Sequence, residues 1–147
     1  MFKKLYFLTK RLIFTISFLI SPDNKRSILI RFYYGCKVGK NVKWTGMPIM
    51  GSESKLISIG DDVTIARNVV FHTHDGAVRL FRDEYPGINR IGKITIGNNV
   101  FVGSDCIIMP NITIGDNVII GSGSIVTKSI PSDKVAAGVP AKKLNLF

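Results

Sequence analysis

The stretch Ile96-Gly97-Asn98-Asn99-Val100-Phe101 is the first of six consecutive six-residue blocks that run to Pro131. Each block opens with Ile or Val and carries a second small or aliphatic residue four places later, and Gly follows the opener in four of them. A helix repeats its apolar face at about 3.6 residues and a strand at about 2, so neither produces a strict period of six. A short strand that ends in a corner does. We therefore predict that each block is one flat side of a coil, with its opener pointing inward and its Gly at the turn. The openers are Ile96, Val102, Ile108, Ile114, Ile120 and Val126.

The same pattern recurs upstream from Ile59 to Gly76, and its first trace is the block from Val38 to Lys43. Three blocks make one triangular turn. The sequence therefore predicts one coil from residues 59–76 and two more from 96–131, stacked at about 4.8 Å like the strands of a parallel sheet.

Residues 77–95 break the register between the coils and read as an inserted loop. Loops on a rigid scaffold tend to carry function. This loop mixes aromatic side chains, arginines and carboxylates, and sugars are bound by aromatic faces and by Arg forks. Candidate contacts with a sugar are Arg79, Arg82 and Tyr85, and the alternative is a loop that only forms the wall of a site. Trp44 is a second candidate platform, or else a cap on the first coil.

Composition and charge restrict the class of protein. The 147 residues are 46% hydrophobic, which suits one domain with a continuous core. A formal charge of +10 implies an anionic partner: a nucleotide, an acidic glycan, a nucleic acid or a membrane surface. Cys36 and Cys106 are the only cysteines, and Cys106 falls at an inward position, which predicts burial rather than a disulfide or zinc site.

The first 34 residues differ from the rest, and we predict a helical segment over 1–34 followed by a β-helix domain over 35–147. The uncharged run Leu12–Ile20 is too short to cross a bilayer, which needs about 20 apolar residues. Two helices are expected, over about 3–20 and 22–34. The basic residues ahead of the run are Lys3, Lys4, Lys10 and Arg11. The helices either cover the open edge of the coil stack, or a partner chain, or anchor the protein to a membrane surface.

Several motifs together resemble the hexapeptide-repeat acyltransferases. They are the blocks themselves, their ending at Ile120–Pro131, and the later segment Ala137-Gly138-Val139-Pro140-Ala141-Lys142. Within that family, Phe71-His72-Thr73-His74-Asp75-Gly76 followed by a long loop is most similar to bacterial capsule and exopolysaccharide O-acetyltransferases. The resemblance covers about residues 38–143. It implies an all-β fold, a left-handed parallel β-helix, assembled as a homotrimer with active sites between neighbouring subunits.

The resemblance also implies a track for acetyl-CoA along the last coils. In the family, backbone groups hold the pantetheine arm and the nucleotide meets the final Gly-x-Pro-Ala-Lys segment. Mapped onto this sequence, the arm would follow Gly103, Ser104, Gly121 and Ser122, with Lys128, Lys142 and Lys143 near the phosphates. Lysine is an adequate point charge for phosphate, although each lysine alone is equally well a solvated surface charge.

Acetyl transfer from a thioester to a hydroxyl needs a base that takes the hydroxyl proton and returns it to the leaving thiolate. Imidazole suits both directions. The chain has only two histidines, His72 and His74, in one block before the inserted loop. By resemblance to the family's His-Asp-Gly corner, the catalytic role falls on His74, and His72 takes an orienting or acceptor-facing role. The alternative is a pair of surface histidines without a role.

The sequence leaves open which carboxylate orients the catalytic imidazole. Asp75 could orient an imidazole or bind a donor on the acceptor, and a carboxylate from a stacked coil could equally orient it. Those alternatives are Asp61, Asp62 and Asp105. Negative charge develops on the thioester oxygen, and a backbone N–H beside Gly103 or Ser104 could stabilise it.

The sequence therefore predicts an acetyl-CoA-dependent O-acetyltransferase that acts on a sugar hydroxyl of a capsule or exopolysaccharide precursor by direct transfer. We expect a cytoplasmic protein, with a possible peripheral contact at the inner membrane face, and no metal requirement. The alternatives are N-acetylation of an amino sugar, transfer to a small molecule such as serine, and a non-catalytic scaffold or lectin. A γ-type carbonic anhydrase would need three metal-binding histidines, and nucleic-acid binding would need a basic motif interleaved with aromatics, which is not found here.

Overall fold

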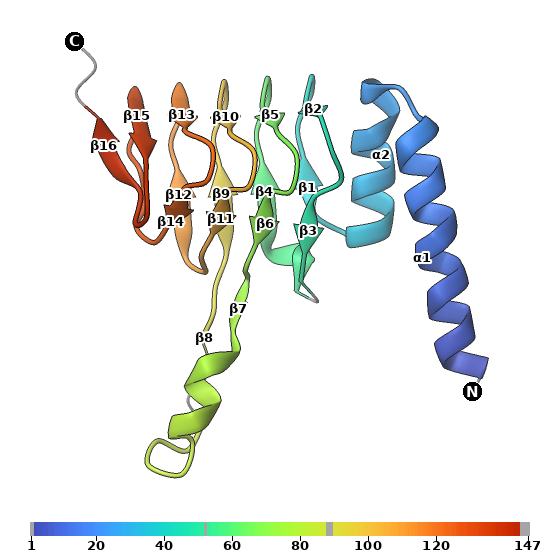
Figure 1. The fold of residues 1–147 in the computed structure, drawn as a ribbon, viewed down its shortest axis with the longest axis horizontal. Helices are drawn as coiled ribbons and strands as arrows, with labels where there is room; N and C mark the ends of the chain where they lie inside the picture. The colour runs from blue at the N-terminus through green and yellow to red at the C-terminus, as the bar shows by residue number, and fades with distance from the viewer. Residues whose placement is uncertain (1, 52, 88–89, 145–147) are drawn as a thin grey trace.

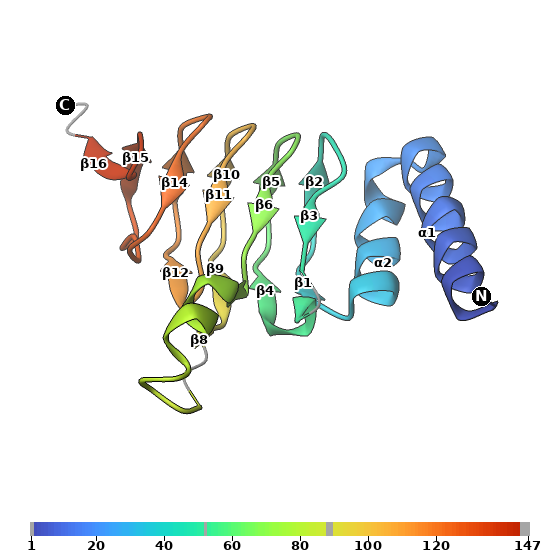
Figure 2. The same ribbon diagram turned by 60° about the horizontal axis from the view of Figure 1, so that its bottom comes forward.

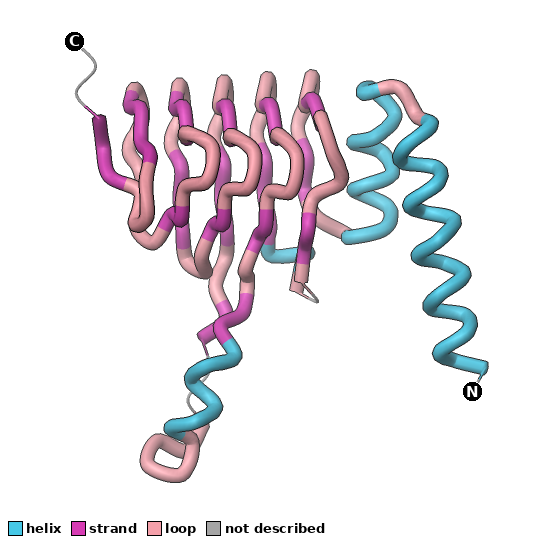
Figure 3. The backbone as a smooth tube through the Cα atoms, in the orientation of Figure 1, coloured by secondary structure: helices cyan, strands magenta, loops and turns pink. Residues whose placement is uncertain are grey.

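Three parallel sheets form the sides of a triangular prism, as the six-residue period predicts (Figure 1). The computed structural model describes residues 2–51, 53–87 and 90–144. The chain winds as a left-handed parallel β-helix. Each strand is only two to four residues long and ends at a corner, as the alternating strand and loop segments of Figure 3 show.

Each sheet takes one strand from each coil. The first contains β1 (Lys37–Val38), β4 (Ile57–Ile59), β9 (Ile94–Ile96) and β12 (Ile112–Ile114). The second contains β2 (Lys43–Trp44), β5 (Thr64–Ile65), β10 (Phe101–Val102), β13 (Val118–Ile120), β15 (Lys134–Ala137) and β16 (Lys142–Leu144). The third contains β3 (Ile49–Met50), β6 (Val70–Phe71), β11 (Ile107–Ile108) and β14 (Ile125–Val126). Neighbouring strands are parallel except β15 and β16, which pair antiparallel.

The core is a set of stacked columns. An inward residue recurs every six places, once on each side of a coil, and the equivalent residues of successive coils lie one above another. All six openers from Ile96 to Val126 are buried, which confirms their predicted orientation. The register places Ile59, Ile96 and Ile114 in one column, and a bridge from Ile114 to Ile130 continues it. The predicted burial of Cys106 is also confirmed.

The prediction of three coils was wrong, because residues 37–50 form a complete first coil, and the described residues make four complete coils and part of a fifth. The period of six does continue there, but Trp44 and Met50 take the places that Ile or Val occupies elsewhere. Trp44 is fully buried, so it is a core residue of the first coil rather than a platform for a sugar.

The second-position glycine does stand where the turn begins, as predicted, but it does not supply the left-handed conformation of that turn. The residue with left-handed φ is the fourth of most blocks, usually Asn or Asp, as at Asn99 (φ 52°) and Asn117 (φ 56°). Both residues tolerate this conformation, and their side chains bond across the coils, where Asn99 Nδ2 donates to Asn117 Oδ1 at 2.9 Å. The second-position glycine is needed for close approach instead. A Cβ on Gly97 would lie 2.8 Å from the carbonyl carbon of Gly115.

An arm leaves the prism between the second and third coils and projects well away from it (Figures 1 and 2). It contains β7 (His74–Asp75), the 3-10 helix η2 (Gly76–Phe81) and β8 (Arg90–Ile91), with β7 and β8 antiparallel. The insertion is therefore displaced from the expected 77–95, because β9 already belongs to the first sheet. A shorter excursion after the first coil carries the 3-10 helix η1 (Ser54–Leu56).

Two helices precede the prism, as predicted: α1 (Phe2–Ile20) and α2 (Asp23–Tyr34). Helix α2 covers the open end of the first coil, and α1 lies outside it (Figures 1 and 2). The Trp44 indole N–H donates to Ser27 Oγ at 3.0 Å, and Arg26 donates to the Trp44 carbonyl at 2.6 Å. Phe14 of α1 stacks on Tyr33 of α2, with ring centroids 4.0 Å apart. The exposed sheet edge is thus covered within the chain.

Candidate active site

Both histidines lie where the arm leaves the third sheet. The backbone N–H of His72 still donates to the Ile108 carbonyl of the next coil, whereas His74 is the first residue of β7. Both imidazoles are exposed, and Thr73 between them is buried. The block from Phe71 to Gly76 was predicted to be a side of the coil and is instead the root of the arm. His74 therefore stands beside the prism wall, on a hairpin, rather than in the wall.

Thr73 is a residue that the sequence analysis did not single out. It is 1% exposed, and its hydroxyl has no hydrogen-bond partner among the described residues. Its carbonyl accepts a bond from Gly92 N at 2.9 Å, which closes the root of the arm where the chain returns to the prism. A buried hydroxyl without a protein partner is uncommon in folded proteins. In the sequence, its position between the two histidines was the feature that could have identified Thr73 as a site residue.

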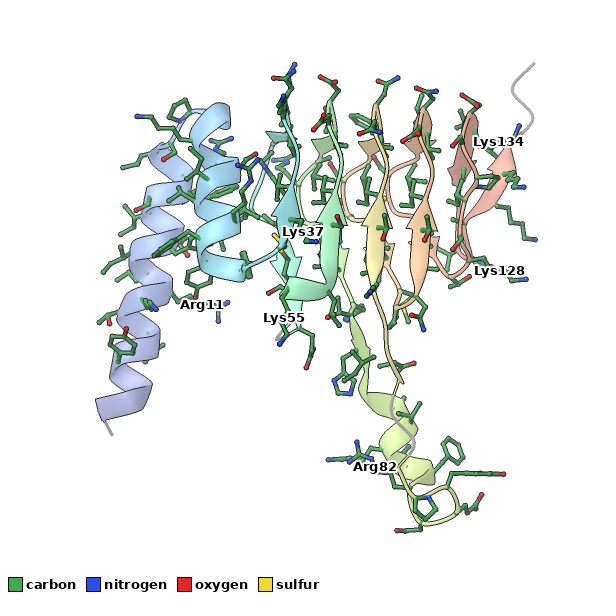
Figure 4. All side chains as sticks on the ribbon, turned by 180° about the vertical axis from the view of Figure 1, so that it is seen from behind. Arg11, Lys37, Lys55, Arg82, Lys128 and Lys134 are labelled. Atoms are coloured by element: carbon green, nitrogen blue, oxygen red, sulfur yellow. The ribbon has the colours of Figure 1, made fainter. Side chains whose placement is uncertain are left out.

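The candidate acceptor residues all lie on the arm. The Asp75 carboxylate accepts a bond from Ala77 N at 3.1 Å and so caps η2. Arg79, Arg82 and Tyr85 are exposed, and Arg82 lies far from the prism (Figure 4). Ile88 and Asn89 fall outside the described residues. Arg79, Arg82 and Tyr85 are therefore accessible to solvent on the arm.

A second set of candidates gathers at the corner that follows the second sheet, which we call the serine corner. Its residues are Ala66 and Arg67, Gly103 and Ser104, and Gly121 and Ser122, one pair per coil from the second to the fourth. Backbone bonds stack them, since Gly103 N donates to the Ile120 carbonyl and Gly123 N to the Ser104 carbonyl. A Cβ on Gly103 would lie 2.5 Å from Ser122 N, so this corner accepts no side chain at that position.

The serine corner differs from the corner after the first sheet in its backbone N–H groups. At the corner after the first sheet, the backbone N–H of the third residue of each block is occupied. Asp61 N donates to Asn98 Oδ1, Asn98 N to Asp116 Oδ1 and Asp116 N to Ser132 Oγ. At the serine corner, the equivalent N–H groups of Ser104 and Ser122 donate to no described residue. Gly103 N is occupied within the coil, which leaves Ser104 as the oxyanion candidate of that pair. This corner therefore offers a row of unpaired donors.

The lysines divide between two corners. Lys142 pairs with Ala137 across β15 and β16, and a Cβ on Gly121 would meet Ala137 Cβ at 2.8 Å, so Lys142 continues the serine corner. Lys143 is its neighbour in β16. Lys128 lies elsewhere, one residue past Thr127, at the corner that follows the third sheet (Figure 4).

That other corner, which we call the histidine corner, stacks His72 on Met109 and Met109 on Thr127. Met109 N donates to the Val126 carbonyl at 3.1 Å. The two corners are six residues apart on each coil, for example from Gly103 to Met109, and at about 3.3 Å per residue this is at most about 20 Å. Within one chain, the histidines and the serine corner therefore lie at opposite ends of the third sheet.

The alternative orienting carboxylates are held in the coil stack. Asp61 accepts from Lys40 N at 2.7 Å, Asp62 from Asn41 Nδ2 at 3.0 Å, and Asp105 from Asn68 Nδ2 at 3.0 Å. They stiffen corners other than the histidine corner. Within the described part of the chain, Asp75 is the carboxylate that shares a segment with the histidines.

Cys106 lies beneath the serine corner, with its Sγ 3.2 Å from the Gly121 carbonyl oxygen. Burial raises the pKa of its thiol, which disfavours the nucleophilic thiolate. An acyl-cysteine intermediate is therefore unfavourable at this position. Among the described residues, no group of three His, Cys, Asp or Glu side chains is placed to hold a metal ion.

A groove of about 470 Å³ lies away from these corners, between α1, α2 and the first coil. Its lining includes Arg11, Phe14, Tyr33 and Met47, and none of the candidate site residues. The histidines and the serine corner thus lie outside this groove, at two different corners of one chain.

The family model for bacterial transferase hexapeptide (six repeats) matches residues 93–128. Protein CapG of Staphylococcus aureus is 51% identical over 112 residues, which cover 75% of this chain and 65% of CapG. The galactoside acetyltransferase solved in complex with coenzyme A is 32% identical, has a TM-score of 0.64, and covers 93% of this chain and 78% of that one. This chain belongs to the hexapeptide-repeat acetyltransferase family.

A further hexapeptide-repeat structure, the maltose O-acetyltransferase from Clostridium difficile 630, is 30% identical with a TM-score of 0.61. The match covers 90% of this chain and 81% of that one. The chain spans less than two thirds of the curated relatives it matches, 65% of CapG and 56% of the galactoside O-acetyltransferase of Escherichia coli (strain K12). Family membership confirms the resemblance drawn from the blocks.

Proposed function

We propose that this protein transfers an acetyl group from acetyl-CoA to a hydroxyl of a sugar in a capsule or exopolysaccharide precursor. The observation that carries the proposal is the row of unpaired backbone N–H groups at the serine corner. Extended amide ligands bind such donors as an added strand would. The pantetheine arm has two amides, and a related hexapeptide-repeat acetyltransferase was solved with coenzyme A.

The chemistry uses His74 as the general base. His74 accepts the proton of the acceptor hydroxyl while its oxygen bonds to the thioester carbonyl carbon. When the C–S bond breaks, the imidazolium returns that proton to the thiolate, so the products are an acetyl ester and free coenzyme A. The Ser104 N–H is our candidate for stabilising the carbonyl oxygen as it gains negative charge. No residue is acylated, in agreement with the raised pKa of the Cys106 thiol.

A complete site requires two chains in this proposal. Within one chain, His74 and the serine corner lie at opposite ends of the third sheet. A neighbouring chain that packs its serine corner against the histidine corner would join them. Cyclic symmetry repeats that contact, and we propose a homotrimer with one site at each interface. The exposed arm, with Leu80 and Phe81 in solvent, would then lie against a neighbour.

The acceptor is proposed to bind between the arm and the histidine corner. Tyr85 offers a ring face, while Arg79 and Arg82 offer forked donors for hydroxyl or carboxylate groups. Lys142 and Lys143 would bind the phosphates of coenzyme A at the far end of the serine corner. Lys128 lies on the histidine corner, so it would serve the acceptor side or a neighbouring chain's nucleotide.

The test compares purified His74→Ala and His72→Ala proteins of matched thermal stability with the wild type. We expect His74→Ala to lower kcat at least about 100-fold, because general acid–base catalysis is worth about 10²–10⁴-fold. Coenzyme A affinity, measured by calorimetry, should stay within a few-fold because the thioester arm is held elsewhere. His72→Ala should cost less. Near-wild-type turnover in both variants would contradict the mechanism, and the reverse order would move the base to His72.

A further inference from the structure

Helix α1 buries only one side. Phe14 and Phe18 are buried on the side of α1 that packs against α2, where Phe14 stacks on Tyr33. The opposite side has a continuous apolar surface of residues that are each 51–79% exposed. Its members are Tyr6, Leu8, Leu12, Ile13, Ile16, Leu19 and Ile20.

At 100° per residue these side chains span about 160° of the helix with no charged residue among them. The one polar residue within the span, Thr9, donates its hydroxyl to the Tyr6 carbonyl at 2.9 Å and so needs no outside partner. Monomeric soluble proteins rarely leave a continuous apolar surface of this kind without a binding role. A membrane-spanning role does not fit, since no described helix is long and apolar enough to cross a bilayer.

Cations border this apolar surface on both sides. Lys10 lies at one margin, over the Tyr6 ring at 5.5 Å, and Arg11 lies at the other, on the side toward the prism (Figure 4). The sequence contains no Asp or Glu before Asp23, so α1 brings no carboxylate to pair with these charges.

We infer that the outer face of α1 docks on an anionic lipid bilayer and lies in the plane of its surface. An apolar face bordered by cations matches the interface of such a membrane, where the aliphatic side chains enter the acyl region and the cations meet lipid phosphates. A second copy of the chain fits less well, because a two-fold contact through this face would bring cationic margins together with no carboxylate between them.

The position of α1 in the fold supports this docking. Helix α1 lies at one end of the coil stack, beyond α2, and the flat sides of the prism face away from it (Figures 1 and 2). Any cyclic assembly of parallel prisms joined through those sides would place every α1 at the same end. Several copies would then contact one bilayer together, and their binding would be reinforced by proximity.

The experiment is flotation of the full chain with vesicles of phosphatidylglycerol and phosphatidylcholine, or of phosphatidylcholine alone. We expect binding to the anionic vesicles that weakens as salt rises. Leu12→Asp/Ile16→Asp should lower the partition coefficient at least about 50-fold, because it places two carboxylates in the apolar face. Lys10→Gln/Arg11→Gln should lower binding to anionic vesicles by about 5-fold per cation.

The matched control is Ile28→Asp/Phe32→Asp, which makes the same kind of change, at the same spacing, at two exposed apolar residues of α2. It should keep vesicle binding within about 2-fold. Folding is checked by circular dichroism, and assembly by light scattering. Wild-type protein that stays unbound at millimolar anionic lipid overturns the inference. So does a mass by light scattering that falls in Leu12→Asp/Ile16→Asp, since a second copy would then cover this face. Neither readout depends on transferase activity.

Discussion

The strongest prediction concerns where one active site is divided between chains. If His74 comes from one chain and the serine corner from its neighbour, two inactive variants should restore activity when they assemble together. The first variant is His74→Ala. The second is Ser122→Trp, which places a large side chain on the exposed rim of the serine corner and should block the pantetheine arm without disturbing the core.

The magnitude follows from counting interfaces. In a cyclic trimer formed from equal amounts of both chains, a site works only where an intact His74 meets an intact serine corner of the next chain. Random assembly makes this true for about one site in four, so the mixture should show about a quarter of wild-type activity. Mixed trimers purified through two different tags should each hold one working site in three, or about a third. Each parent alone should be near background.

The assay is acetyl-CoA turnover by co-expressed, doubly purified protein, with chain composition measured by mass spectrometry. Mixed trimers that are no more active than their parents would refute the division of the site between chains. Ser122→Trp protein that binds coenzyme A normally would instead refute the serine corner as its track. Mixtures of each variant with wild-type chains supply the controls.

Three further predictions follow from the coil geometry and the charges. Gly97→Ala should destabilise the fold by about 1–3 kcal/mol, because its Cβ would lie 2.9 Å from Asp116 N, whereas Gly76→Ala, with nothing within 4 Å, should be near neutral in urea titration. Burial raises the pKa of the Cys36 thiol from 9.0 to about 11, so the unfolded chain loses this proton first and stability should fall as pH rises from about 9 toward 11. Cys36→Ala should flatten that part of a stability-against-pH curve, and an unchanged slope would contradict the assignment. Lys142→Glu/Lys143→Glu should weaken coenzyme A binding at least about 10-fold at low salt and reduce its salt dependence in calorimetry, whereas equal affinity would place the phosphates elsewhere.

Much of the architecture could be read from the blocks because their period reflects a local constraint. An inward residue every six places and a left-handed residue at most corners are satisfied within a few neighbouring residues. The first coil escaped detection for the same reason, since Trp44 and Met50 hold inward places without resembling Ile or Val. The role of the second-position glycine was misread because its constraint is the backbone of the next coil, which lies about 18 residues along the chain at Gly97 and Gly115.

By itself, the sequence determined the β-helix, the two leading helices, the inserted segment and the family, all of which depend on order along the chain. Only the tertiary structure decided which corner each candidate occupies. His72 follows a strand of the third sheet, whereas Ser104 follows a strand of the second sheet. The turns between the sides of the coil therefore place these two residues at different edges of the prism. The tertiary structure also decided that α2 covers the first coil while α1 keeps an apolar face in solvent, because burial depends on what packs against a helix and not on its own pattern.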